Sequence, residues 1–473
     1  MSSDPSSCDC EAPSGRGLDR RRAIGLLAGA AAATLLPGTA WAAPARALQA
    51  AAALPADEQR LFKLLNADRA LQHIEKLSES IGPRIGGTES EAEAAEYLAE
   101  RLDRWGFATR LQPFPVADKF LGELERRGGT PLPQDICWQV GASSQGALDT
   151  VVRGEAVDVG AGGAAGYPAD VTGKVVLVDY PGTAAARNAA VATAVARGAA
   201  AIVFLAADQV FPRRAGAFTP AISGPVAIPV LGAAQVQKER LRALVAAGPL
   251  DLRVRTAAHR GLTSRNVLAE RAGDPAAPVV MVCAHYDSVI GAKGANDDGS
   301  GTALTLELAQ TLRKLPTEAT IQFGLWGSEE QGLIGSRYYV ASLSPAERAR
   351  YLAVFNNDMV ATSWDQATMY WVLSANGQPN AATAAVIAAA NRLGYSSMLS
   401  PVTLRGSSDH QSFQDVGIAS GNFTWRAQGS PALLEPPYHT PEDTVALNVS
   451  RDRLKLSLEF ISSAMYATAG PIA

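Results

Sequence analysis

The sequence predicts an α/β protein whose main sheet is doubly wound and mainly parallel, with helices on both faces. Three observations predict this fold class. From residue 261 onward, short apolar runs typical of buried strands alternate with stretches of helical apolar spacing. The run Val279–Cys283 is apolar throughout, as expected of a strand covered on both faces. Apolar residues make up 47% of the 473 residues and charged residues 19%, a composition that excludes a disordered chain.

The net charge of the chain and its N-terminal residues indicate which partners and which cellular location to expect. The net charge is −4, and lysine and arginine are scattered without a basic stripe, which argues against a nucleic-acid partner. Residues 1–42 have the order of an export signal, with three arginines at 20–22, an apolar run at 23–36, and Ala-Trp-Ala ending at Ala42 as a cleavage site. The paired arginines are typical of a twin-arginine signal. Since the apolar run is shorter than the roughly 20 residues that span a bilayer, we expect an exported protein, periplasmic or extracellular, without stable membrane insertion.

The N-terminal segment predicts two helical regions and one extended stretch. Helical apolar spacing covers 56–80, and a second helix runs from Thr88 to about Trp105. Thr88 and Glu91 have the spacing of a capping box at the start of this second helix. Residues 107–116 are typical of an extended segment.

Weak patterning over 117–145 indicates a boundary, and the block after it predicts a compact α/β module. Its β-rich runs alternate with Ala-rich helical stretches. Strands are expected at 150–158, 175–178, 202–205, 228–231 and 251–255, and helices at 184–197 and 233–247.

The remaining chain predicts the main sheet and completes the division into domains. Strands are expected at 279–283, 320–326, 352–356, 369–373 and 421–425, and helices at 301–314, 331–343, 380–393 and 450–468. The predicted parts are a signal peptide at 1–42, the N-terminal part of the main domain at 43–135, an inserted domain at 136–260, and the main part at 261–473. In a doubly wound sheet, ligands bind outside the carboxyl ends of the strands.

Side chains of the types that bind metal ions occur in the sequence just after these predicted strands. His285 and Asp287 follow the strand 279–283, and residues i and i+2 of an extended chain share a side. Further acidic and imidazole side chains follow the next strands or lie in nearby loops, at Asp297, Asp298, Glu329, Glu330, Asp358 and His439. Buried carboxylates are costly unless they are paired or bind metal. Imidazole with carboxylate and no thiolate predicts divalent cations, with zinc in a hydrolytic site, or manganese or cobalt, as the candidates.

The motifs that carry these residues resemble those of the co-catalytic di-zinc aminopeptidases, which include secreted bacterial and fungal leucine-type enzymes. The matching segments are His285-Tyr286-Asp287-Ser288, Gly294–Gly301, Trp326–Ser336, Asn357-Asp358-Met359 and Tyr438-His439-Thr440-Pro441. Their order and spacing match across about 280–445. Gly82-Pro83-Arg84 and the helix after it resemble the family's N-terminal portion. Residues 146–258 resemble the protease-associated domain that interrupts the peptidase in many members. The resemblance implies a fold of the zinc exopeptidase type.

The resemblance also assigns a role to each residue. It implies two zinc ions per chain, with Asp297 bridging both, His285 and Asp358 completing one, and Glu330 and His439 completing the other. Glu329 is then the general base, and Asp287 accepts a hydrogen bond from the His285 ring and fixes its tautomer. Asp409, in Ser408-Asp409-His410, matches a further family segment that shapes the floor of the site. Tyr438 has two interpretations, a group that polarises the substrate carbonyl or an aromatic ring packed beside His439. Asp298 is expected to act as a turn residue and helix cap.

The function that follows is an exported metallo-aminopeptidase that hydrolyses N-terminal residues from peptides. Two adjacent cations can polarise the scissile carbonyl and activate water for attack. Glu329 would take the proton of the water and pass it to the leaving amine. The inserted domain would cover part of the site and limit access of substrates.

Three alternative functions share the same fold. A related carboxypeptidase or dipeptidase would need arginines that bind a free C-terminal carboxylate, for which Arg337, Arg405 and Arg426 are candidates. A glutaminyl-cyclase-like role would use one metal, and the intact second ligand set argues against it. A non-catalytic receptor-like member would have lost ligands, whereas none is lost here.

Overall fold

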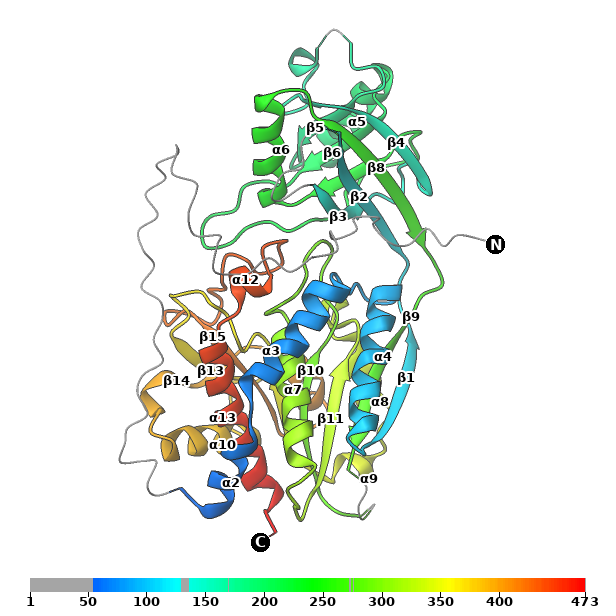
Figure 1. Cartoon of the computed structure of the whole chain (residues 1–473). Helices are drawn as coiled ribbons and strands as arrows, with labels where there is room; N and C mark the ends of the chain where they lie inside the picture. Colours follow the sequence, from blue (N-terminus) through cyan, green and yellow to red (C-terminus); the bar gives the residue numbers. More distant parts are fainter. Residues whose placement is uncertain (1–53, 129–135, 169, 272–273, 275, 473) are drawn as a thin grey trace, which may run out of the picture.

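The computed structural model describes residues 54–128, 136–168, 170–271, 274 and 276–472, and the predicted signal peptide at 1–42 lies outside them (Figure 1). One body carries an open sheet flanked by helices, and a second body carries a closed barrel. No helix within the described ranges combines the length and the apolar composition needed to cross a bilayer.

The open sheet has eight strands, and four of its seven pairings are parallel. The strand order is β1 (Ala108–Pro115), β9 (Thr263–Glu270), β11 (Thr320–Trp326), β10 (Val279–His285), β12 (Tyr351–Asn357), β15 (Ser420–Arg426), β13 (Met369–Ser374) and β14 (Leu399–Leu404). The four central strands, from β11 to β15, run parallel, whereas β9 and β13 join them antiparallel. The predicted α/β class with a mainly parallel doubly wound sheet is confirmed.

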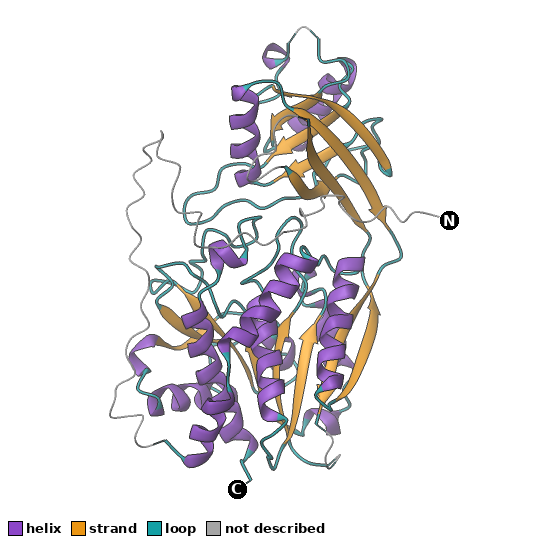
Figure 2. Ribbon diagram, in the orientation of Figure 1, coloured by secondary structure: helices purple, strands orange, loops and turns teal. Residues whose placement is uncertain are grey.

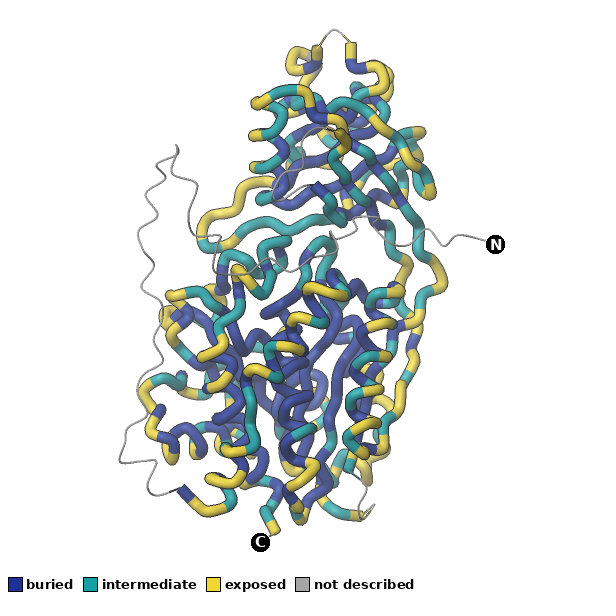
Figure 3. Tube along the Cα trace, in the orientation of Figure 1, coloured by how far each residue is buried: buried dark blue, intermediate teal, exposed yellow. Residues whose placement is uncertain are grey.

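Helices cover both faces of this sheet, as Figure 2 shows. Even-numbered residues of β10, such as Val280 and Val282, enter the larger core under one set of helices, whereas Met281 and Cys283 enter a smaller core on the other face. The larger core is packed by α2 (Ala56–Leu64), α3 (Ala67–Glu75), α4 (Glu89–Arg104), α7 (Gly299–Leu312), α10 (Ala381–Arg392) and α13 (Arg451–Ala469). The other face carries α8 (Ile334–Ser342) and α11 (His410–Gln414), and short helices α9 (Pro345–Arg348) and α12 (Val445–Asn448) lie in connections. Figure 3 shows the central strands as the most continuously buried part of this body.

The second body is a seven-stranded closed barrel with two helices. Its strand order is β2 (Lys119–Arg127), β3 (Cys137–Ala142), β7 (Val230–Ala233), β6 (Ala201–Leu205), β5 (Val175–Asp179), β4 (Thr150–Asp158) and β8 (Asp251–His259), with α5 (Ala184–Ala196) and α6 (Gln235–Ala247). The barrel begins at Lys119, whereas the sequence prediction gave residues up to 135 to the main domain. The reason is that β2 pairs with β8 along its whole length, although its charged residues conceal the alternating pattern.

Several local predictions differ from the structure. The helix expected over 56–80 is interrupted because Asn66 accepts hydrogen bonds from the backbone of Asp68 and Arg69, which starts a new helix, α3. A π-helical turn, Lys76–Ile81, follows directly. Strands β2, β3, β9 and β14 were not predicted as strands.

The predicted capping box at Thr88 and Glu91 is wrong. The Thr88 side chain makes no cap hydrogen bond. Glu91 is instead buried and accepts hydrogen bonds from Gly87 N at 2.6 Å, Ser264 Oγ at 2.7 Å and Ser328 N at 3.0 Å. This carboxylate therefore ties α4 to the segment that follows β11.

Candidate metal centre

The predicted metal-binding side chains lie at the carboxyl edge of the parallel strands. His285 is the last residue of β10, Glu330 lies in a short 3₁₀ turn after β11, and Asp358 follows β12 directly. Asp297 lies in the loop between β10 and α7, and His439 lies between β15 and α12. The structure thus brings together residues that are up to 154 positions apart in the sequence (285 to 439).

These five residues form two clusters that share one carboxylate. In each cluster, His285–Asp297–Asp358 and Asp297–Glu330–His439, one ligand atom per residue lies within 4.8 Å of the others. Asp297 Oδ1 is 3.2 Å from His285 Nε2, and Asp297 Oδ2 is 3.1 Å from His439 Nε2. Glu330 Oε2 is also 3.1 Å from His439 Nε2. Each oxygen of Asp297 therefore faces a different cluster.

The donor atoms of both clusters fit zinc. Imidazole nitrogen and carboxylate oxygen are among the ligands that zinc prefers. Two buried carboxylate oxygens of the clusters, Asp297 Oδ2 and Glu330 Oε1, make no hydrogen bond in the described part of the chain. Leaving such groups without partners is costly, and a cation removes that cost for atoms that ligate it.

Negative charge dominates the electrostatics of the centre. Burial acts to lower the pKa of His285 and of His439, but the surrounding carboxylates raise both pKa values well above the ordinary range. Burial raises the pKa of Glu330, and repulsion from Asp297 adds to the rise. The protein therefore holds more buried acid here than its two imidazoles balance, as expected for a site built around cations.

Asp287 connects two of the strand ends. Its two oxygens accept hydrogen bonds from Glu329 N at 2.9 Å and Glu330 N at 3.3 Å. Its Oδ1 also lies 3.4 Å from His285 Nδ1. One buried carboxylate thus fixes the backbone of the Glu329–Glu330 turn and contacts the far side of the His285 ring.

The turn that carries Glu329 has an unusual backbone. Ser328 and Leu333, on either side of the 3₁₀ segment Glu329–Gln331, have φ values of 55° and 61°. Residues other than glycine seldom adopt this left-handed region, and they do so mostly at functional sites. Met359 and His439 share the feature, with φ values of 63° and 58°.

Asp298 acts as the helix cap that the sequence predicted. Its Oδ1 accepts hydrogen bonds from Gly301 N at 2.8 Å, in the first turn of α7, and from Met359 N at 3.2 Å. Asp298 therefore fixes Asp297 and Asp358 relative to each other without belonging to either cluster.

Asp409 and Tyr438 lie around the clusters. The carboxylate of Asp409 is fully buried without a hydrogen bond among the described residues, and burial raises its pKa to about 7. Burial also raises the pKa of Glu329 well above its usual range, and the negative charge of Asp409 adds to that rise. The Tyr438 ring stacks on His439 at 3.7 Å between centroids, which is the packing interpretation. Contact of Tyr438 with substrate stays a prediction.

Sequence reasoning missed two groups that support the centre. Arg84 is fully buried and donates to the backbone carbonyls of Tyr286, Lys293 and Gly294, at 2.6, 2.6 and 2.9 Å. Burial lowers the pKa of Arg84 to about 10, so it remains a cation beneath the carboxylates. Asp443 accepts hydrogen bonds from Asn296 N at 2.9 Å and Asp297 N at 3.0 Å. The signal that the sequence offered for Asp443 was its position, four residues after the predicted ligand His439.

We predict that Asp443→Asn destabilises the protein by about 1–3 kcal/mol, the cost of unsatisfied buried hydrogen-bonding groups. An amide can accept only one of the two backbone hydrogen bonds and turns an N–H toward the other. Burial raises the pKa of Asp443 to about 6, so urea unfolding at pH 8 compares the amide with the ionised carboxylate.

The neighbouring Glu442→Gln variant is the control for this prediction. The Glu442 carboxylate is half-buried and 3.7 Å from Arg214, so we expect a change within about 0.5 kcal/mol. Equal stability of the two variants would contradict the role given to Asp443.

Segments of the barrel reach the loops of the centre. Lys119 Nζ donates to Gln331 Oε1 at 2.7 Å, next to the Glu329–Glu330 turn. Gly216 lies so close to His439 that a Cβ at this glycine would be 2.2 Å from the His439 carbonyl oxygen. The loop between β6 and β7 therefore packs directly on the residue that completes the second cluster.

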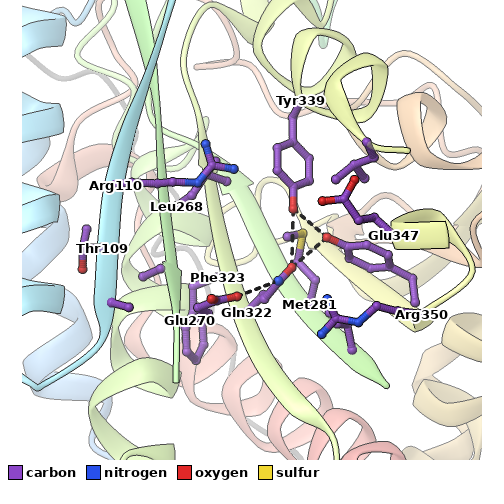
Figure 4. A pocket seen from close by; sticks show the side chains of 15 residues that line it. Thr109, Arg110, Leu268, Glu270, Met281, Gln322, Phe323, Tyr339, Glu347 and Arg350 are labelled. Atoms are coloured by element: carbon purple, nitrogen blue, oxygen red, sulfur yellow. Dashed lines mark hydrogen bonds between the residues drawn. The ribbon is translucent and has the colours of Figure 1, made fainter. Parts of the chain in front are cut away.

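A surface pocket of about 350 Å³ lies apart from the centre, along β1, β9, β11 and α8 (Figure 4). In Figure 4, Tyr339 and Gln322 point toward each other across it. Tyr351 Oη donates to Gln322 Oε1 at 2.7 Å, and Gln322 Nε2 donates to Glu270 Oε2 at 3.0 Å. None of the predicted site residues lines this pocket.

Cleavage after the predicted signal peptide would leave two cysteines, Cys137 and Cys283, and the sequence alone does not decide whether they pair. Cys283 is a buried free thiol, so no bridge joins it to Cys137. Its Sγ lies 3.4 Å from Asn356 Oδ1, beneath the centre.

Known proteins resemble this chain in sequence and in structure. Residues 266–465 match peptidase family M28. The chain is 35% identical to aminopeptidase YwaD of Bacillus subtilis over 408 residues, which cover 85% of this chain and 84% of that protein. A solved structure of BSAP, a zinc aminopeptidase from Bacillus subtilis, superposes with a TM-score of 0.60 at 32% identity, over 86% of this chain and 96% of that one. The aminopeptidase of Aneurinibacillus sp. strain AM-1 gives 0.55 at 30% identity, over 88% and 97%. Since the family match contains both clusters and the likeness to YwaD extends over most of both chains, this protein belongs to peptidase family M28.

Proposed function

We propose that this chain is an exported zinc-dependent aminopeptidase that holds two zinc ions and removes N-terminal residues from peptides. The observation that carries the proposal is the pair of clusters that share Asp297. Similar proteins support it, since YwaD is named an aminopeptidase and BSAP a zinc aminopeptidase. In this proposal His285 and Asp358 would hold one ion, Glu330 and His439 would hold the other, and Asp297 would contribute to both sites.

The chemistry divides between the metal and the protein. Bound zinc would supply a Lewis acid for the scissile carbonyl and would lower the pKa of water. Glu329 accepts the proton of the attacking water and delivers it to the amine that leaves. Asp287 fixes the Glu329 backbone through a 2.9 Å hydrogen bond, so the base is held while its carboxylate stays free to move a proton.

Two features of the site favour exopeptidase action: the negative charge of its carboxylates and the restricted approach to its clusters. The carboxylates around the clusters favour a cationic group, which the free α-amine of a peptide supplies. We infer that the barrel is a protease-associated domain whose β6–β7 loop narrows the approach. That loop packs on His439 through Gly216, so a chain end reaches the clusters more easily than the middle of a long peptide.

Export is proposed from the sequence. The arginines at 20–22, the apolar run at 23–36 and the cleavage pattern at Ala42 support it. An exported peptidase would act on peptides in the periplasm or outside the cell.

A carboxypeptidase or dipeptidase of the same fold is the second candidate, and one observation favours it. Arg405 is half-buried and remains a cation, since burial lowers its pKa only to about 10, and it forms no ion pair with a carboxylate of the described residues. Arg337, the third arginine considered, is exposed on α8.

One assay separates the two functions. The zinc-loaded chain should hydrolyse leucine p-nitroanilide and should not hydrolyse N-acetylated dipeptides. Phenanthroline should abolish the activity and added zinc should restore it. If the chain cleaved the N-acetylated dipeptides and left leucine p-nitroanilide intact, the carboxypeptidase or dipeptidase function would replace the aminopeptidase function.

A further inference from the structure

The loop between β6 and β7 presents two adjacent apolar side chains to solvent. Val210 is 90% exposed and Phe211 is 65% exposed. Exposed apolar residues are common on soluble proteins, so the position of this pair decides what it can do. The loop runs along the side of the barrel that faces the open sheet (Figure 1), and its Gly216 packs on His439, a residue of the second cluster.

The segment that carries the pair is closed at its base by one side chain of α6. Gln235 is buried, and its Oε1 accepts hydrogen bonds from Gln209 N at 3.1 Å and Ala215 N at 3.3 Å. Gln235 N also donates to Ala215 O at 2.8 Å. The two ends of the segment therefore lie side by side. Val210 thus begins next to Ala215, the residue before Gly216.

Further contacts fix this segment as a turn of defined shape. Arg213 N donates to Val210 O at 3.2 Å, which closes the turn that contains Phe211. Arg214 Nη1 lies 3.7 Å from Glu442 Oε2, in the loop that also carries the histidine of the second cluster. The backbone of the turn is therefore held in place before any partner arrives, so binding to it costs little conformational entropy.

The occupant that fits this position is the peptide substrate itself. A peptide whose N-terminus lies at the clusters extends its later residues outward, at about 3.3–3.6 Å per residue. The path from His439 through the base of the loop to Val210 is about as long as four or five such residues. We propose that Val210 and Phe211 bind an apolar side chain of the substrate a few residues after the scissile bond. This contact rests on the aminopeptidase function proposed above, and it gives that enzyme a preference among longer peptides.

Hexapeptide amides test the contact position by position. Each peptide begins with leucine and continues with alanine, and one alanine at the third, fourth, fifth or sixth position is replaced by phenylalanine or by serine. The measured quantity is kcat/KM for leucine release by the zinc-loaded full chain, expressed as a phenylalanine-to-serine ratio at each position. We expect a ratio of about 3 to 10 at one or two neighbouring positions, because a partly covered aromatic ring gains a fraction of its full transfer free energy.

Variants of the turn assign the preference to its two side chains. Val210→Ser/Phe211→Ser should bring the ratio close to one, whereas Phe211→Leu keeps an apolar side chain and should retain most of the preference. Both side chains are exposed, so these substitutions carry little risk of misfolding. Val195→Ser is the matched control, because Val195 is 39% exposed on α5, in the half of the barrel away from the open sheet (Figure 1), and the ratio should not change.

Three results would overturn the contact. The first is a ratio near one at every position in the wild type, and the second is wild-type ratios in the double variant. The third is loss of a dimer in the double variant with unchanged ratios, measured by sedimentation, which would make the turn an interface between two copies of the chain. If the wild type released no leucine from any peptide, the aminopeptidase function would fail and the contact with it, whereas equal release from all peptides overturns the contact alone.

Discussion

Replacing Glu329 with glutamine should lower kcat by about 10²- to 10⁴-fold, the usual contribution of general acid–base catalysis, while zinc content and fold are retained. The Glu329 carboxylate belongs to neither cluster, and its position is set by the backbone hydrogen bond to Asp287 at 2.9 Å. The amide has the same shape and keeps that hydrogen bond. It cannot accept the proton of the attacking water, so only proton transfer is lost.

The neighbouring Glu330→Gln variant is the sharpest comparison for this result. Glu330 has one oxygen 3.1 Å from His439 Nε2 within the second cluster, so its variant should lose zinc as well as turnover. Zinc per chain, measured by elemental analysis after dialysis, and kcat on leucine p-nitroanilide distinguish the two variants. Near-normal kcat in zinc-loaded Glu329→Gln would remove Glu329 from its role as base. Equal zinc loss in both variants would place it among the ligands.

The central strands were predictable because burial on both faces gives a strand a continuous run of apolar residues in the sequence. β10 is buried at every residue and is apolar from Val279 to Ala284, and β11 is buried at six of its seven residues, with Ile321, Phe323, Leu325 and Trp326 as its large apolar side chains. β2 and β14 have one solvated side and carry charged, polar or proline residues, so their patterns resemble loops. β9 joins the sheet antiparallel between β1 and β11, a pairing that no local pattern specifies.

The convergence of the cluster residues was predictable for a related reason. Each cluster residue follows a strand end or lies in a short motif, so position along the chain already indicates convergence. The supporting groups lack such a signal. Glu91 bonds to Ser328 across 237 residues, and Arg84 to Gly294 across 210. Their roles depend on which segments pack together, as does the approach of the β6–β7 loop to His439.

Asp297→Asn should remove zinc from both clusters, because Asp297 is the residue that they share. Its two oxygens lie 3.2 and 3.1 Å from the two imidazoles, one on each side. An amide offers one neutral oxygen and turns an N–H₂ group toward the other imidazole. We expect zinc per chain to fall from two to below one, with turnover lost.

His439→Ala is the matched variant that affects one cluster only. It leaves His285, Asp297 and Asp358 intact, so we expect one zinc per chain to remain. The difference between these two variants tests the bridge itself, independently of activity. If Asp297→Asn instead kept one zinc, as His439→Ala does, the two clusters would bind their ions independently. The shared carboxylate would then be a neighbour of one ion and no link between them, and two-metal hydrolysis would lose its structural basis.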